Sequence, residues 1–247
     1  MTYSQLNPIT FRSGDGTTEL EGFWHLPSSQ ATNGAVLVLH GSRATKEAAL
    51  NQWLCEGAAQ LGLTALRFDF RYVHNQHASQ PDMASCIDDL VGAYNFLQSF
   101  GKEIKPKRLY LLGKSLGAMV AMQASTNGPL TGMGTGIAAL GLPLHDEAKQ
   151  KYYDYSELPK LSCPALFVIG ELDNFGTPAE LKPLLSTLTV PFELAIIQQV
   201  GHSYEPLAAS LSQADRNEQQ SHNQQQVTKL VLKWLAQQEA DRPSLRT

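Results

Sequence analysis

Short apolar runs, many of them rich in β-branched residues, recur along the chain and predict the strands of a buried sheet. They lie at residues 35–39, 64–70, 109–112, 137–140, 165–169 and 192–197. Continuous apolar runs of this length are typical of strands covered on both faces, as in a parallel sheet between helices. Upstream, apolar and polar positions alternate over residues 20–26, which predicts an edge hairpin with one solvent-facing side. The Gly-Asp-Gly sequence at 14–16 marks the turn that precedes it.

Amphipathic stretches lie between these runs and predict helices. They cover residues 46–60, 83–100, 116–125, 178–186 and 224–238. Strands that alternate with helices predict an α/β three-layer sandwich with right-handed crossovers. Neither a repeat nor a linker interrupts the pattern, so we expect a single domain over residues 1–247. The glutamine-rich segment 213–226 is interpreted as a solvated loop that leads into the last helix.

The strongest local motif is Gly113-Lys114-Ser115-Leu116-Gly117, between a predicted strand and a predicted helix. Such a turn strains the serine backbone, and small residues two positions before and after it let the neighbouring chain pass close by. The turn also places the hydroxyl at a helix N-terminus, where negative charge is favoured. We therefore predict that Ser115 is a nucleophile. The other interpretation is a glycine-flanked serine in an ordinary turn. Lys114 is expected to point away from Ser115, with no chemical role.

A serine nucleophile needs a histidine base that a carboxylate orients, and both are found after later apolar runs. His202 follows the run at 192–197, and Asp173 follows the run at 165–169. Asp146, after the run at 137–140, is the alternative acid. The chain order Ser115, Asp173, His202 is that of one large class of hydrolases.

The motifs LVLHGS, RFDFRY, GKSLGA, GELDNFGTP and GHSY resemble those of the α/β-hydrolase superfamily, most closely its small dienelactone-hydrolase-like members. The resemblance runs from the strand of Trp24 to the helix of Trp234. It implies an eight-stranded, mostly parallel sheet. It also implies an oxyanion hole with one N–H from Leu116 and a second from Ser42, or alternatively from Arg43.

The same resemblance bears on two neighbouring segments. His40, which opens the His-Gly loop, is expected to brace the oxyanion turn. Residues 144–164 stand where many of these enzymes insert a helical lid, and this stretch is too short for a full lid domain. We therefore expect an open site. Tyr152, Tyr153 and Tyr155, with Tyr72, either line an acyl or leaving-group pocket or simply pack the loops.

Composition excludes several other classes of protein. The 247 residues are 43% hydrophobic and 17% charged, and the net charge of −4 comes without a dense Lys/Arg block, which argues against a nucleic-acid binder. Three scattered cysteines without a CxxC spacing argue against a disulfide framework or a zinc site. The absence of a G-x-G-x-x-G turn argues against a dinucleotide, so no cofactor or metal is expected. With neither a leader nor an 18-residue apolar run, the protein is expected to be soluble and cytoplasmic, as a monomer or homodimer.

Together these features predict a serine-dependent acyl hydrolase. The expected substrates are small carboxylic esters, thioesters or lactones, which would pass through an acyl-enzyme on Ser115. One alternative is a serine peptidase of the same fold, which needs a gating domain that this chain lacks. The other is a catalytically silent protein that uses the fold to bind a partner or ligand.

Overall fold

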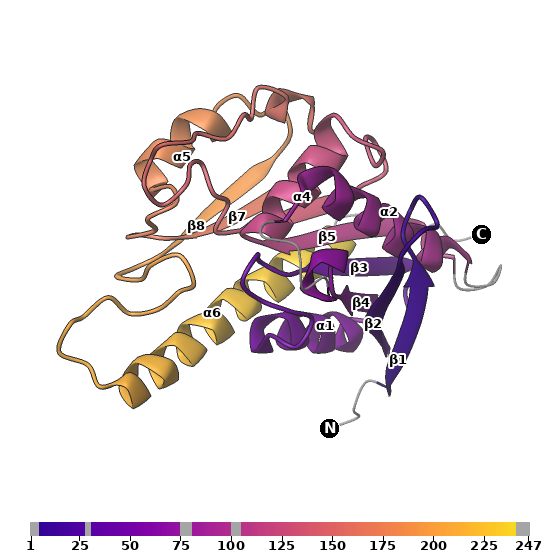
Figure 1. Cartoon of the computed structure of the whole chain (residues 1–247), viewed down its shortest axis with the longest axis horizontal. Helices are drawn as coiled ribbons and strands as arrows, with labels where there is room; N and C mark the ends of the chain where they lie inside the picture. The colour runs from indigo at the N-terminus through magenta and orange to yellow at the C-terminus, as the bar shows by residue number, and fades with distance from the viewer. Residues whose placement is uncertain (1–4, 28–30, 75–80, 100–104, 241–247) are drawn as a thin grey trace.

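The computed structural model describes residues 5–27, 31–74, 81–99 and 105–240. Within these residues eight strands form one sheet, in the spatial order β1-β2-β4-β3-β5-β6-β7-β8 (Figure 1). The strands are β1 (Gln5–Arg12), β2 (Glu19–Leu26), β3 (Gly34–Leu39), β4 (Thr64–Phe68), β5 (Arg108–Lys114), β6 (Gly136–Leu140), β7 (Ala165–Gly170) and β8 (Phe192–Ile197). The helices are α1 (Ala49–Gln60), α2 (Met83–Ser99), α4 (Leu116–Thr126), α5 (Pro178–Leu185) and α6 (Gln213–Ala240), with short 3₁₀ turns η1 (Arg71–His74) and η2 (Leu158–Lys160).

The sheet is antiparallel at one edge and parallel elsewhere. β2 pairs antiparallel with both β1 and β4, and every pairing from β4 across to β8 is parallel. This confirms the predicted fold, with eight strands in a mostly parallel sheet. The chain leaves β3 toward β4 on one side and returns as β5 on the other. Open sheets of this kind bind ligands at the carboxyl ends of the strands beside such a reversal.

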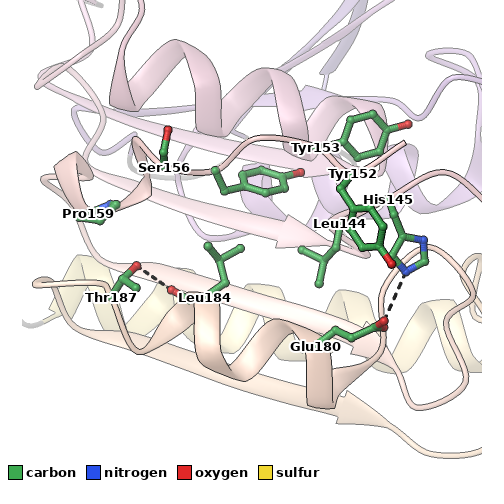
Figure 2. A pocket seen from close by; sticks show the side chains of 10 residues that line it. Leu144, His145, Tyr152, Tyr153, Ser156, Pro159, Glu180, Leu184 and Thr187 are labelled. Atoms are coloured by element: carbon green, nitrogen blue, oxygen red, sulfur yellow. Dashed lines mark hydrogen bonds and ion pairs between the residues drawn. The ribbon is translucent and has the colours of Figure 1, made fainter. Parts of the chain in front are cut away.

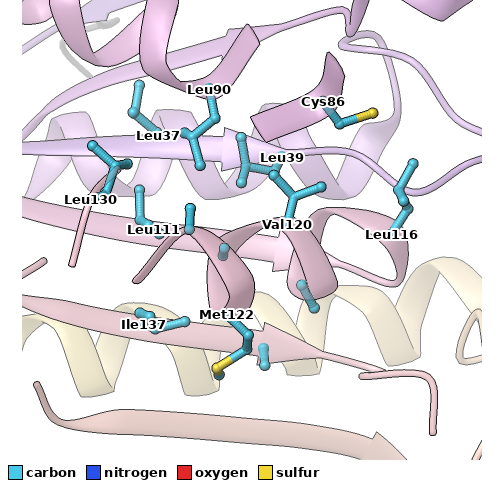
Figure 3. Close-up of a cluster of buried hydrophobic side chains, with 14 of the residues drawn as sticks. Leu37, Leu39, Cys86, Leu90, Leu111, Leu116, Val120, Met122, Leu130 and Ile137 are labelled. Carbon is cyan, nitrogen blue, oxygen red and sulfur yellow. The ribbon is translucent and has the colours of Figure 1, made fainter. Parts of the chain in front are cut away.

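Helices cover both faces of the sheet, as the continuous apolar runs require. Figure 1 shows α2, α4 and α5 on one face and α1 with α6 on the other. All six residues of β3 are buried: Leu37 and Leu39 belong to the cluster under α2 and α4, and Val36 and Val38 to the cluster under α1 and α6. Figure 3 shows the first of these clusters. Successive side chains of a strand point to opposite faces, so a strand between two helical layers is apolar throughout.

Most predicted boundaries differ from the observed ones by one or two residues, and three of the differences have a visible physical cause, which two of them share. The first helix begins at Ala49 instead of Lys46, because Lys46 is bound elsewhere: its backbone N–H and its ammonium group each donate to Asp69 at 2.6 Å. β4 ends at Phe68 instead of Phe70, where the chain turns to present the Asp69 carboxylate. The contact thus ties the end of β4 to the segment that leads into α1.

The third difference is larger, because the prediction of a loop at 213–226 is wrong. Helix α6 already begins at Gln213, and its first half is helical throughout. Glutamine is a good helix former, and three amide side chains here have partners. Gln220 and Gln224 donate to the carbonyl of Ser203, and Asn223 donates to that of Tyr204. No helix in the described ranges carries an apolar stretch long enough to cross a bilayer.

Candidate active site

Ser115 lies in a sharp turn between β5 and α4. Its backbone has φ 52° and ψ −115°, a conformation that few non-glycine residues adopt, and its N–H donates to the Leu140 carbonyl of the neighbouring strand at 2.9 Å. A Cβ at Gly113 would lie 2.3 Å from the Gly117 backbone, and one at Gly117 would lie 2.3 Å from the Leu39 carbonyl oxygen. The two glycines are therefore required by close approach, and the motif forms the turn that its residue types predict.

A continuous hydrogen-bonded relay starts at the Ser115 hydroxyl. Ser115 Oγ lies 2.8 Å from His202 Nε2, and His202 Nδ1 lies 2.9 Å from both carboxylate oxygens of Asp173. Because an ionised carboxylate only accepts, Nδ1 carries the ring proton and Nε2 is left as the acceptor for the serine hydroxyl. The structure thus brings the three predicted residues together at the carboxyl ends of β5, β7 and β8.

The loop that carries His202 is held in several ways. The Gly201 N–H donates to the Glu205 carbonyl, and the Glu205 carboxylate accepts from the Ser203 N–H at 2.6 Å. Tyr204 is fully buried, and its hydroxyl donates to the Val168 carbonyl of β7. The amides of α6 described above add three further bonds to the same loop. The imidazole is therefore presented by a braced segment.

Asp173 is buried and has a second hydrogen-bond partner. Its Oδ1 accepts from the Phe175 N–H at 2.9 Å, and the Phe175 ring packs on the His202 ring with centroids 4.4 Å apart. The alternative acid, Asp146, lies in a different environment, since its carboxylate accepts from the backbone N–H groups of Gln150 and Lys151 within its own loop. The structure therefore places Asp173 beside His202 and uses Asp146 to shape a turn.

Electrostatics keep His202 in the form that a general base needs. Burial lowers the pKa of His202 below its usual value, and the nearby Lys114 ammonium lowers it further, against the opposing effect of Asp173. The imidazole is therefore predominantly neutral at pH 7, with its Nε2 lone pair able to accept a proton.

The groups predicted to bind an oxyanion surround Ser115. The Leu116 N–H belongs to the first residue of α4, which has no acceptor for it within the helix. The Gly41 loop lies against the nucleophile, because a Cβ at Gly41 would sit 3.4 Å from Ser115 Cβ. Within the described residues, neither Ser42 nor Arg43 uses its N–H to bind another protein group, and both line the cleft. Both of them stay candidates for the second donor.

His40 braces this loop as expected. It is buried, its Nε2 accepts from the Phe70 N–H at 3.1 Å, and its Nδ1 donates to the Gly41 carbonyl at 2.8 Å. Burial lowers the pKa of His40, so the ring is neutral and can donate one hydrogen bond and accept another. The Asp69–Lys46 contact anchors the other end of the loop.

Lys114 is the residue that sequence reasoning missed. The expectation that its side chain points away from the nucleophile is wrong, since its Nζ lies 3.3 Å from His202 Nε2. The motif contains no signal for this, because the direction of the side chain depends on the space left by residues far along the chain.

Ser115 opens into a cleft with a volume of about 1190 Å³. Its lining mixes apolar side chains such as Met119 and Phe175 with charged ones such as Arg43 and Glu147. A second pocket of about 460 Å³, mostly apolar, lies between α5 and the segment 144–159 (Figure 2).

The predicted tyrosines divide between these cavities. Tyr153 and Tyr155 line both, Tyr152 lines the second alone, and the Tyr72 hydroxyl contacts the Gly41 carbonyl instead. In the ranges that the structure covers, no group of three or more His, Cys, Asp or Glu side chains is arranged to hold a metal ion.

Comparison with known proteins finds a hydrolase family and hydrolase structures that are similar to this chain. The sequence profile of the alpha/beta hydrolase domain family matches residues 32–231. A dienelactone hydrolase from Anabaena variabilis is similar in structure, with a TM-score of 0.69 and 21% identity over 94% of this chain and 97% of that one. An esterase from Pyrococcus furiosus has a TM-score of 0.65 and 19% identity, over 92% of this chain and 93% of that one. A serine hydrolase without a lid, from Xanthomonas campestris, has a TM-score of 0.61 and 18% identity, over 90% of this chain and 95% of that one. At these identities the likeness shows the fold. A search of curated proteins finds no match.

Proposed function

The chain belongs to the alpha/beta hydrolase domain family, and on that premise we propose that it is a serine-dependent acyl hydrolase of small carboxylic esters, thioesters or lactones. One observation carries the proposal: the relay from Ser115 Oγ through His202 to a buried Asp173, with bonds of 2.8 and 2.9 Å. A serine hydroxyl is a weak nucleophile at neutral pH, and this arrangement gives it a base and orients that base.

The first half of the proposed reaction forms an acyl-enzyme. Ser115 Oγ attacks the acyl carbonyl as its proton passes to His202 Nε2, and Asp173 stabilises the resulting imidazolium. The N–H groups of Leu116 and of Ser42 hold the oxyanion, and each such donor can be worth about 10²–10³ in turnover. When the tetrahedral intermediate collapses, His202 returns the proton to the leaving oxygen or sulfur. The alcohol or thiol then departs and the acyl group stays on Ser115.

The second half uses the same groups on water. His202 takes a proton from a water molecule, whose oxygen attacks the acyl carbonyl of the ester on Ser115. Collapse of the second intermediate breaks the bond to Oγ, and His202 protonates Oγ as the carboxylic acid is released. A lactone follows the same steps, except that its alcohol remains attached to the acid product.

The proposed substrate size rests on the cleft. Its mixed polar and apolar lining suits short or soluble acyl groups better than long lipid chains. The names of two relatives, a dienelactone hydrolase and an esterase, support carbonyl substrates of this kind. The cytoplasmic location and the monomeric or dimeric state stay predictions.

The test is covalent labelling of the nucleophile. The purified protein is exposed to a fluorophosphonate probe, and the adduct is located by mass spectrometry, with Ser115→Ala as the control. We expect a single adduct on Ser115 in the wild type and none in the variant. Turnover of a panel of short esters, thioesters and lactones, lost in Ser115→Ala, then identifies the substrate class. A folded protein that takes up no probe contradicts the proposal and leaves the silent binding protein. Cleavage of peptides in place of esters leaves the peptidase.

A further inference from the structure

The side chain of Lys114 reaches the reacting end of the relay. Lys114 is the last residue of β5 and directly precedes Ser115, and its Nζ lies 3.3 Å from His202 Nε2. His202 Nε2 also lies 2.8 Å from Ser115 Oγ. Two donor side chains that are adjacent in the sequence therefore converge on one imidazole nitrogen.

The fold leaves room for the lysine and encloses its charged end. A Cβ at residue 141 would sit 2.9 Å from Nζ, so Gly141 creates the space that the ammonium group occupies. The Tyr204 ring lies 5.6 Å from Nζ on the side of the His202 loop. Asp173 and Glu205 are the acidic groups that act on Lys114 electrostatically. Across the described residues neither carboxylate forms an ion pair with Nζ, and the hydrogen-bonding contact of Nζ is with His202.

The two converging donors compete for one acceptor. A neutral imidazole whose Nδ1–H is bound to Asp173 has a single lone pair, on Nε2. Ser115 must donate to this lone pair to be activated, and an ammonium group at Lys114 donates to it as well. Proton transfer from Ser115 would then create an imidazolium beside that ammonium group, and like charges at this distance repel.

Loss of one proton from Lys114 reverses both effects. A neutral amine is no longer an obligatory donor, so the serine hydroxyl has Nε2 to itself. The amine lone pair can also accept from the Nε2–H that forms when His202 takes the serine proton. The contact therefore opposes the reaction when Lys114 is charged and supports it when Lys114 is neutral.

We propose that Lys114 is a positioning residue that sets the availability of His202 as a base, holding the reaction back as an ammonium group and releasing it as a neutral amine. This inference rests on the proposed function of Ser115.

The protonation state of Lys114 changes within an accessible range of pH. Burial lowers the pKa of Lys114 to about 8, with Asp173 and Glu205 acting in the opposite direction. At pH 7 roughly one molecule in ten then carries the neutral amine. We expect kcat/KM to rise in two steps, first as His202 loses its proton below its usual pKa, and again by roughly tenfold around pH 8.

The test compares pH profiles of the wild type and two variants with a short aryl ester, using Ser115→Ala protein as the blank for spontaneous hydrolysis. Lys114→Met keeps the length of the side chain and removes the charge. It should show the first step alone and exceed the wild type at pH 7 by roughly tenfold. Lys114→Arg keeps its charge across the range and should stay slow up to pH 9.5. A wild-type kcat/KM that does not change from pH 7 upward overturns the proposal. So does a Lys114→Met enzyme whose kcat/KM is lower than that of the wild type at every pH and depends on pH in the same way.

A measurement that needs no turnover separates this proposal from the one on which it rests. The pKa of His202, followed by NMR of histidine-labelled protein, should rise toward its ordinary value in Lys114→Met, because a neighbouring positive charge has been removed. An unchanged His202 pKa contradicts the role of Lys114 even if Ser115 is an active nucleophile. A failure of Ser115 to take up the fluorophosphonate probe contradicts the hydrolase proposal, whatever the titration shows.

Discussion

The nucleophile and its base are held by two different kinds of structure. The elbow, residues 113–117, is held by short-range backbone geometry, with glycines that let β5, α4 and the end of β3 approach within van der Waals contact. The base loop, residues 198–206, receives hydrogen bonds from Gln220, Asn223 and Gln224 of α6. The nucleophile is therefore positioned by the backbone of its own pentapeptide, packed closely against β3 and bonded to β6. The base depends on a helix that forms later in the chain.

The largest effect is expected where the base receives its orientation. In Asp173→Asn the amide group can donate to Nδ1 and so favours the tautomer with a proton on Nε2, which cannot accept from Ser115. We expect kcat/KM for a short ester to fall by about 10⁴ with little change in stability. Asp146→Asn is the matched control, since that carboxylate accepts only from backbone amides of its own loop. A larger loss in Asp146→Asn would mean that the acid has been assigned wrongly.

A smaller loss is expected from breaking the elbow itself. The Cβ of Gly117→Ala would lie 2.3 Å from the Leu39 carbonyl oxygen, so β3 and α4 must move apart. We expect stability to fall by about 1–3 kcal/mol and kcat/KM by about a hundredfold, as Ser115 shifts relative to His202. Chemical denaturation and steady-state kinetics measure the two effects.

The control for the elbow is Gly134→Ala. Its Cβ would meet Cys163 Sγ at 3.6 Å, an ordinary contact, so this variant should behave like the wild type. If the two alanine variants lose equal stability, the elbow does not depend on the close approach described here.

The smallest effect is expected from weakening the support of the base loop. Asn223→Ala removes the bond from Nδ2 to the Tyr204 carbonyl and leaves that buried oxygen without this donor. We expect about 1 kcal/mol of lost stability and a loss of kcat/KM between about threefold and tenfold as the imidazole becomes less well placed. Gln226→Ala, on the same helix but exposed and bonded only to His222, is the control. Equal kinetics in the two variants would show that α6 does not position the base.

The comparison also explains which features the sequence predicts. The strands could be located because a sheet covered on both faces requires continuous apolar runs, and residues 35–39 and 165–169 are buried throughout. Ser115 could be located because its motif is complete within five residues. Asp173 and His202 followed from the order of strands, since each comes soon after an apolar run. The run before Asp173 is buried throughout, whereas the run at 192–197 forms the edge strand β8 and is exposed or only partly buried, so its predicted cover on both faces is wrong. In each case the sequence signal is contained in a short stretch of the chain.

The features that were missed depend on contacts between distant segments. The first half of α6 shows few apolar positions, and two of its glutamines bind the carbonyl of Ser203, 17 to 21 residues earlier. The direction of Lys114 depends on the empty space at Gly141 and on His202, which is 88 residues away. The start of α1 depends on Asp69, at the end of another strand. The pattern of residues in a short stretch of sequence does not indicate such distant partners.

The strained backbone at Ser115 has a consequence for the evolution of this protein in the laboratory. With φ at 52°, the position suits glycine, which reaches such angles without a steric penalty. Exchanging serine for glycine would relax the turn, so the inert protein would resist heat better than the wild type. A library selected for thermal resistance alone is therefore expected to enrich glycine at this position and to discard the hydroxyl. Thermal stability favours glycine at position 115, and turnover requires serine there.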